Sequence, residues 1–142
     1  MKREILFRGK RKDGGIWLFG DLRQWSKTRK GICDYALKNT SEVDPKTVGQ
    51  FTGLTDKNGK KIFEGDVFHL DDEIIAVVIF KDGCFRLEEY GLCGAWTESG
   101  FDECGGGWGV IECDPIDWYT IRDMEIIGNI HDNPELLEGG VV

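Results

Sequence analysis

Residues 50–68, QFTGLTDKNGKKIFEGDVF, contain two short β-prone runs separated by a turn signal. The first run is 50–55 and the second is 60–68. Between them, Asn58-Gly59 is a strong hairpin signal, because both residues tolerate a positive φ. A second break follows at Gly65, where we expect the ribbon to bend and a new sheet to begin. This stretch therefore predicts a hairpin that leads from one β region into another.

The residues before this stretch predict a mainly β lobe. Sustained helical periodicity is absent, and short β-prone runs alternate with polar turns. The expected strands are 3–8, 16–22, 32–37 and 48–52. A glycine-containing turn at 10–15 joins the first two as a hairpin, while 24–31 and 41–47 are predicted to be polar connections.

The residues after Gly65 predict a small barrel. The expected strands are 67–70, 74–80, 84–88 and 124–130, with a tight turn at Lys81-Asp82-Gly83. Closing such strands into a barrel would protect the edges of the sheet. Asn133 and Pro134 are typical of a helix start, so a short helical turn is expected at 133–137. Its two leucines are predicted to plug the open end of the barrel.

Residues 89–120 are rich in glycine and aromatic residues, and we interpret them as an elaborated loop or extra hairpin inserted in the barrel. Its aromatic residues either form a protein-contact surface or cover a small core; they are Trp96, Phe101, Trp108 and Trp118. Gly105-Gly106-Gly107 lacks the lysine, the preceding strand and the following helix of a phosphate-binding loop, so a nucleotide site is not expected.

Three blocks of the chain resemble the YopX family, whose members are encoded mainly by bacteriophages and prophages. The central block is 51–67, FTGLTDKNGKKIFEGDV, and the outer blocks are 3–8, REILFR, and 125–137, EIIGNIHDNPELL. The match is poor from about 89 to 120. The resemblance implies a C-terminal SH3-like barrel and a phage or prophage origin, and it carries over no enzymatic residue.

Charge is divided unequally along the chain. The whole sequence of 142 residues has a formal net charge of −8. Residues 1–61 contain 15 Lys and Arg against 7 Asp and Glu, which gives +8, whereas residues 62–142 contain 3 against 19, which gives −16. We therefore predict a basic N-terminal β lobe over 1–61, ending in the Asn58-Gly59 hairpin, and an acidic SH3-like barrel over 62–142.

Metal, cofactor and enzyme sites are not predicted. Five cysteines, an odd number, lie at positions 33, 84, 93, 104 and 113 without a CxxC pair, which favours reduced thiols and argues against a structural zinc site. Asp71-Asp72-Glu73 is interpreted as a solvated acidic turn. The sequence contains no HExxH motif and no recognisable Ser/His/Asp set or thiol–imidazole pair. No secretion signal or membrane-spanning run is visible, so we expect a protein of the host-cell cytoplasm.

Three functions by contact remain open. The first is a non-catalytic homo-oligomer in which a basic lobe meets a neighbour's acidic barrel. The second is a nucleic-acid-binding module, although the acidic second part disfavours it. Its candidate contacts are basic residues of the first lobe with one tryptophan, namely Lys10, Arg11, Lys12, Arg23, Trp25, Lys27, Arg29 and Lys30. The third is a binder of a host or phage protein.

Overall fold

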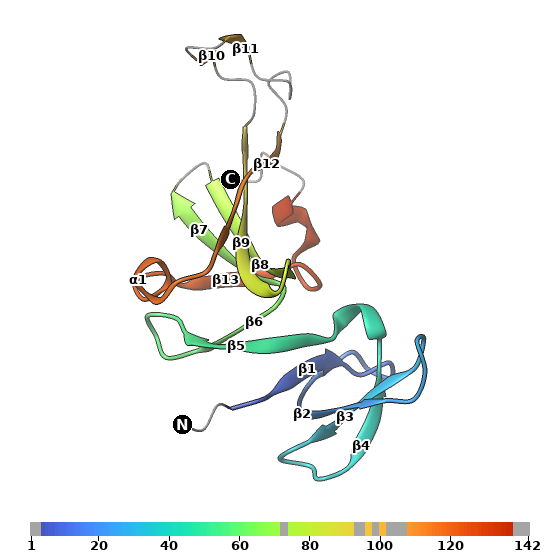
Figure 1. Ribbon diagram of the computed structural model, residues 1–142. Helices are drawn as coiled ribbons and strands as arrows, with labels where there is room; N and C mark the ends of the chain where they lie inside the picture. Colours follow the sequence, from blue (N-terminus) through green and yellow to red (C-terminus); the bar gives the residue numbers. More distant parts are fainter. Residues whose placement is uncertain (1–3, 72–73, 93–95, 98–99, 102–107, 138–142) are drawn as a thin grey trace. The chain divides into compact units, whose positions relative to one another are not determined.

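A computed structural model describes residues 4–71, 74–92, 96–97, 100–101 and 108–137. The predicted mainly β fold is confirmed (Figure 1). The described residues form antiparallel sheets, and the helical segments among them are short. The chain divides into two compact units, Met1–Gly53 and Leu54–Val142. The Asn58-Gly59 turn thus belongs to the second unit. In the described residues, no helix is long and apolar enough to cross a membrane.

The first unit is an antiparallel meander. Its strands are β1 (Phe7–Lys10), β2 (Trp17–Gln24), β3 (Lys30–Asp34) and β4 (Thr40–Val43), followed by the 3₁₀ turn η1 (Pro45–Thr47) and β5 (Gly49–Thr55). β1 pairs with β2, β2 with β3 and β3 with β4, and β5 pairs with β1 on its other side. Gly14 and Gly15 both have a positive φ in the turn before β2, as the sequence predicts.

Strand register gives this meander one apolar face and one polar face. Side chains that alternate along β2 and β3 place Leu18 and Ile32 on the inner face, where they pack with Val43. All three are almost fully buried. The predicted polar connection at 41–47 is wrong at its start, because Thr40–Val43 forms β4. Burial of Val43 and pairing with β3 outweigh the polar composition of that segment.

The second unit contains β6 (Lys61–Phe63) and a five-stranded sheet in the order β12-β9-β8-β7-β13. Its strands are β7 (Asp66–Asp71), β8 (Ile74–Lys81), β9 (Cys84–Leu92), β12 (Trp108–Pro115) and β13 (Ile126–Asn129). A two-stranded ladder, β10 (Trp96–Thr97) with β11 (Gly100–Phe101), lies between β9 and β12 in sequence. The short helix α1 (Trp118–Ile121) precedes β13, and the 3₁₀ turn η2 (Pro134–Leu137) follows it.

Both faces of this sheet carry buried apolar side chains. One cluster is centred on Phe68, Val78 and Ile121, and the other contains Val67, Ile75 and Val77 with leucines of η2 packed against it. Residues 74–78 are therefore apolar at every position, as expected for a central strand covered on both faces. The predicted helical turn at 133–137 is observed, and its leucines cover one face of the sheet.

The turns follow the sequence in part. Gly65 has a φ of 91° between β6 and β7, so the bend predicted there is confirmed. Asp82 and Gly83 both have a positive φ in the turn between β8 and β9. In the Asn58-Gly59 turn, only Gly59 has a positive φ, although both residues tolerate one. The Asp56 side chain organises this turn instead, as described below.

The predicted barrel is not observed as a closed structure. Among the described residues, the pairings of the second sheet end at β12 and β13, which remain its two outer strands. Within the segment 89–120, which the sequence predicts to be an elaborated loop or extra hairpin, β12 pairs with β9 over most of its length and is part of the sheet. Glycines in this segment obscured a strand that long-range pairing stabilises.

Candidate nucleic-acid interface

The polar face of the first unit combines aromatic and basic side chains. Lys10 on β1 is paired with Trp17 on β2, and Arg23 on β2 is paired with Gly31 on β3. Paired residues of neighbouring strands project from the same face of the sheet. Gly31 is in turn opposite Glu42 on β4. This face is opposite the one that buries Leu18 and Ile32. We call it the basic–aromatic face and define it by two groups of residues. Strand register places Lys10, Trp17, Phe19, Arg23 and Glu42 there. Turn residues that contact this face complete it, namely Lys12, Trp25, Arg29 and Tyr35.

Three aromatic rings of this face are open to solvent. Phe19 is 41% exposed, and Trp25 and Tyr35 are each 51% exposed. Tyr35 is held by its hydroxyl, which donates to Asp21 Oδ1 at 2.8 Å. Trp25 lies over the backbone of Gly31, where a Cβ atom would approach Trp25 Cη2 to 2.7 Å. The absence of a side chain at Gly31 therefore makes room for the tryptophan ring.

Cations flank the two tryptophans of the unit. Lys10 Nζ lies 5.6 Å from the centroid of the Trp17 ring, and Arg8 Cζ lies 4.7 Å from it. Arg29 Cζ lies 5.4 Å from the centroid of the Trp25 ring. These distances fit cation–π contacts, which hold a positive charge beside an aromatic surface. An aromatic ring next to a cation suits a ligand with flat bases and phosphates.

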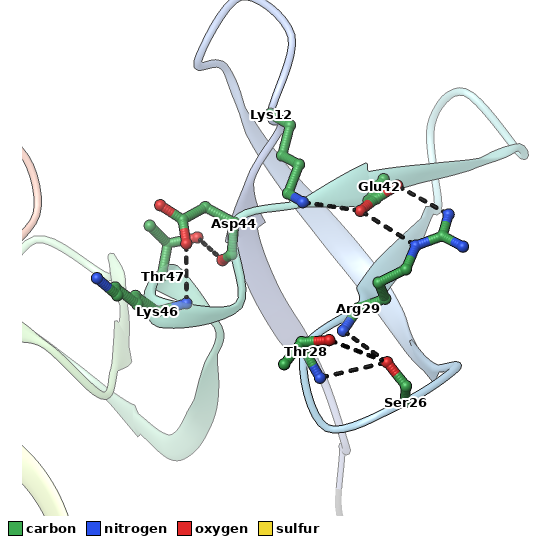
Figure 2. A network of polar contacts seen from close by, with 8 residues as sticks. All are labelled: Lys12, Ser26, Thr28, Arg29, Glu42, Asp44, Lys46 and Thr47. Atoms are coloured by element: carbon green, nitrogen blue, oxygen red, sulfur yellow. Dashed lines mark hydrogen bonds and ion pairs between the residues drawn. The ribbon is translucent and has the colours of Figure 1, made fainter.

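Glu42 joins the turn before β2 to the turn before β3 (Figure 2). Its Oε2 atom accepts from Lys12 Nζ at 2.9 Å, and its Oε1 atom accepts from Arg29 Nη2 at 3.0 Å. The hydrogen bond from Arg29 contributes most to lowering the pKa of Glu42, the hydrogen bond from Lys12 contributes next, and the pKa falls to about 2. The carboxylate is thus charged at any physiological pH, and it partly neutralises both cations.

The turn that carries Arg29 is fixed by its own hydrogen bonds (Figure 2). Ser26 Oγ accepts from the backbone N–H groups of Thr28 and Arg29. Trp25 N–H and Ser26 N–H both donate to the carbonyl oxygen of Arg29. A serine hydroxyl that closes a turn in this way holds the backbone on either side of it. Trp25 and Arg29 are thereby presented together.

The structure gathers some predicted contact residues and separates others. Arg23 is exposed on the basic–aromatic face, and Lys27 is exposed at the turn after β2. Lys30 pairs with Val43 and belongs to the opposite side of the sheet. Arg11 lies 3.9 Å from Asp13 in an exposed ion pair.

Phe19, Tyr35 and Glu42 did not emerge as site residues in the sequence analysis. Tyr35 is placed by hydrogen bonds to Phe19 and Asp21, and Glu42 is placed by the pairing of β4 with β3, so neither position could be read from local sequence. For the predicted protein-contact residues, the side chains lie outside the described part of the structure; their backbones belong to β10, β11, β12 and α1. These residues are Trp96, Phe101, Trp108 and Trp118.

The hallmark block at 51–67 has a structural role. Asp56 is 5% exposed; its Oδ1 atom accepts from the N–H groups of Asn58 and Lys60, and its Oδ2 atom accepts from Ile126 N–H. Asp66, 1% exposed, accepts from Phe63 N–H across the Gly65 bend at 2.8 Å. Two buried carboxylates thus satisfy backbone donors at the turns that shape this unit.

The C-terminal block serves a similar purpose. Asn129 Oδ1 accepts from the N–H groups of His131 and Asp132, and Asn133 N–H donates to the Asn129 carbonyl oxygen. A Cβ atom at Gly128 would meet Asn133 Oδ1 at 2.4 Å. These side chains therefore form the turn that leads from β13 into η2. The described hydrogen bonds thus give this block a structural role in the turn.

Comparison with protein families agrees with the resemblance of these blocks to one known family. The family model described as YopX protein matches residues 6–138. The chain belongs to the YopX family. No curated protein matches it. The buried carboxylates Asp56 and Asp66 lie within the hallmark block of this YopX chain at 51–67, whereas every residue of the basic–aromatic face lies outside that block.

One group of acidic side chains in this YopX chain was missed by the sequence analysis. Glu89 on β9 pairs with Glu112 on β12, and ligand oxygens of these two residues and Asp114 lie within 4.8 Å of one another. Carboxylate oxygens in such a group are ligands suited to a hard cation such as Ca²⁺. Glu89 and Glu112 are 23 positions apart, so only the pairing of β9 with β12 reveals the group.

The acidic group predicts a pH effect on stability. Burial, the hydrogen bond with Glu112 and the neighbouring charges raise the pKa of Glu89 from 4.5 to about 7. The folded protein therefore holds a proton there that the unfolded chain releases, and stability falls as the pH rises from about 4.5 to about 7. We expect Glu89→Gln to raise the free energy of unfolding by about 1 kcal/mol at pH 8, after allowance for solvent screening.

Urea unfolding at pH 5 and pH 8 measures this effect. The gain from Glu89→Gln should be larger at pH 8 than at pH 5. Glu135→Gln, which removes an exposed carboxylate in η2, is the matched control and should show no such difference. An equal gain in unfolding free energy at both pH values would contradict the explanation that the folded protein holds a proton on Glu89.

Proposed function

We propose that the basic–aromatic face of the first unit binds single-stranded nucleic acid. The observation that carries the proposal is the combination of exposed Phe19, Trp25 and Tyr35 with cations on one sheet face. Bases of a single strand can stack on such rings, and the phosphates can contact the flanking Lys and Arg side chains. A duplex hides the faces of its bases, so only its phosphates could contact this face, through the Lys and Arg side chains.

The distribution of charge supports the same unit. Residues 1–53 contain 12 Lys and Arg against 6 Asp and Glu, a net charge of +6, whereas residues 54–142 contain 6 against 20, a net charge of −14. A net charge of −8 for the whole chain therefore conceals a locally basic surface. Since the Debye length is about 8 Å at physiological salt, the acidic unit repels nucleic acid strongly only within about that distance.

Fluorescence anisotropy with labelled 20-nucleotide DNA and RNA tests the proposal. We expect binding at 50 mM salt that weakens with added salt, and weaker binding of the matching duplex. Trp25→Ala should reduce the affinity for the single strand about tenfold, the loss expected for one stacked base. Tyr119→Ala, which removes a highly exposed ring from the second unit, is the matched control and should leave affinity unchanged. Absence of binding at 50 mM salt would refute the proposal.

A second candidate function is head-to-tail self-association. It is supported by the opposite net charges of the two units, which favour contact between the basic unit of one copy and the acidic unit of another. Such contact needs no catalytic group, in keeping with our expectation of a protein that acts by binding. Light scattering after size-exclusion chromatography should then show oligomers at 50 mM salt that dissociate at 500 mM; a monomer at both would eliminate this candidate.

A further inference from the structure

The basic–aromatic face contains a carboxylate that is paired with two cations of the same chain. This pairing affects how single-stranded nucleic acid would bind. Lys12 comes from the turn before β2, and Arg29 comes from the turn before β3. Their nitrogen atoms converge on the two oxygens of Glu42 at 2.9 and 3.0 Å (Figure 2). Arg29 Nε also lies 3.5 Å from Oε2, so the guanidinium presents two donors to the carboxylate. Two donors from Arg and one from Lys on a pair of oxygens form a geometry that also suits phosphate.

We propose that Lys12 and Arg29 form a phosphate subsite, which Glu42 occupies when no strand is bound. This inference rests on the proposed function, and it names the ligand of the subsite as a backbone phosphodiester of single-stranded nucleic acid. A phosphate displaces the Glu42 carboxylate and takes over the donors of both cations. The side chain of Glu42 is 29% exposed, so it can leave the subsite without disrupting buried packing.

The position of Arg29 connects the subsite to a stacking ring. Arg29 lies against Trp25, which in turn lies over Gly31. The Ser26 turn holds the backbone of Arg29 on this side of the sheet. A base stacked on Trp25 would therefore bring its adjoining phosphate near the Arg29 guanidinium. In this arrangement the ring and the subsite contact the same nucleotide.

Glu42 is then a residue that limits affinity and sets its salt dependence. In the wild-type protein, a phosphate that enters the subsite replaces one anion by another, so few counterions are released from it. Removal of the Glu42 charge converts both cations into ordinary phosphate contacts. For single strands, each additional contact steepens the slope of log K against log salt concentration by about 0.7.

The experiment compares Glu42→Gln with the wild-type chain in binding a labelled single-stranded 20-mer from 50 to 300 mM salt. We expect the variant to bind about tenfold more tightly at 50 mM salt, with a slope steeper by about 1.4, the effect of two added contacts. Asp13→Asn is the matched control, because it removes one carboxylate of the same unit that pairs only loosely with Arg11. That control should change the slope by far less.

A second pair of measurements uses Lys12→Gln in both backgrounds. Loss of Lys12 should weaken binding less than twofold in the wild-type chain, where Glu42 already occupies it, but several-fold in Glu42→Gln. Equal losses in both backgrounds, or a Glu42→Gln slope that matches Asp13→Asn, would overturn the subsite. Absence of wild-type and variant binding would instead refute the proposed function, so the two failures are distinguishable.

The wild-type protein provides a readout that does not depend on any variant folding. Titration with the single-stranded 20-mer should shift the Arg29 Hε resonance and the Glu42 carboxyl carbon resonance in NMR spectra. Saturation binding that leaves both resonances in place would show that Glu42 stays on its cations, and would overturn the inference.

Discussion

Gly20→Ala is expected to destabilise the first unit by at least about 3 kcal/mol. An ideal Cβ atom at this position would lie 1.9 Å from the carbonyl oxygen of Cys33 and 3.1 Å from Asp34 Cα. Both contacts are with the backbone of the adjacent strand β3, which cannot move away without breaking its pairing with β2. Loss of this pairing would also displace Leu18 and Ile32 from the core.

Gly14→Ala is the control that separates a steric clash from backbone strain. Gly14 has a φ of 86° but no atom within 4 Å of its ideal Cβ position, so alanine should cost only about 1 kcal/mol. Urea unfolding, together with hydrogen exchange of the Leu18 and Ile32 amides, reports on the first unit. A Gly20→Ala protein as stable as the control would show that the close approach of β2 and β3 does not exist in solution.

Asp56→Asn is expected to destabilise the second unit by about 3 kcal/mol. The buried carboxylate accepts three backbone N–H groups, from Asn58 at 2.9 Å, Lys60 at 2.9 Å and Ile126 at 3.2 Å. An asparagine amide retains one oxygen, and its NH₂ group would face an N–H donor that has lost its acceptor. The hairpin turn and the start of β13 should both loosen.

The effect of Asp56→Asn should depend on pH in a defined direction. Burial raises the pKa of Asp56, but the hydrogen bonds from Lys60, Ile126 and Asn58 outweigh burial and leave the pKa below 3.8. Its stabilisation is therefore fully present above about pH 4 and is lost as the pH falls through the pKa of the folded protein. The difference in unfolding free energy between wild type and variant should shrink below pH 4.

Asp123→Asn is the matched control for this prediction, since it removes a carboxylate of the second unit that is 85% exposed. Urea unfolding from pH 3 to pH 7 should show little change for this control. A pH-independent difference for Asp56→Asn would mean that the Asp56 charge does not contribute to stability.

The strands that the sequence predicted best are those with strong local signals. The β-prone run at 16–22, which follows a glycine-containing turn, and the continuous apolar run at 74–80 correspond to β2 and β8. The hallmark block placed a hairpin turn and a bend correctly, because Gly59 and Gly65 each adopt a positive φ. Strand β4 was missed because its sequence, TSEV, is polar except for Val43, and pairing with β3 is what makes it a strand.

The candidate site was predicted less completely than the fold. Charge counting indicated a basic N-terminal lobe and named Lys12, Arg23, Trp25 and Arg29 as candidates. It could not show that Lys12 and Arg29 share Glu42, because these residues come from three different segments. Nor could it separate Lys30, which lies on the other side of the sheet.

By itself, the sequence determined the class of fold, the YopX membership, the positions of the main turns and the division of charge. These follow from local preferences: glycine where φ is positive, alternation where one face is buried, and an uninterrupted apolar run where both are. The tertiary structure alone decided that β12 joins the second sheet, that this sheet stays open among the described residues, and which aromatic and basic side chains share a face. Strand register sets these outcomes, and it depends on pairing between residues distant in sequence, which no local preference specifies.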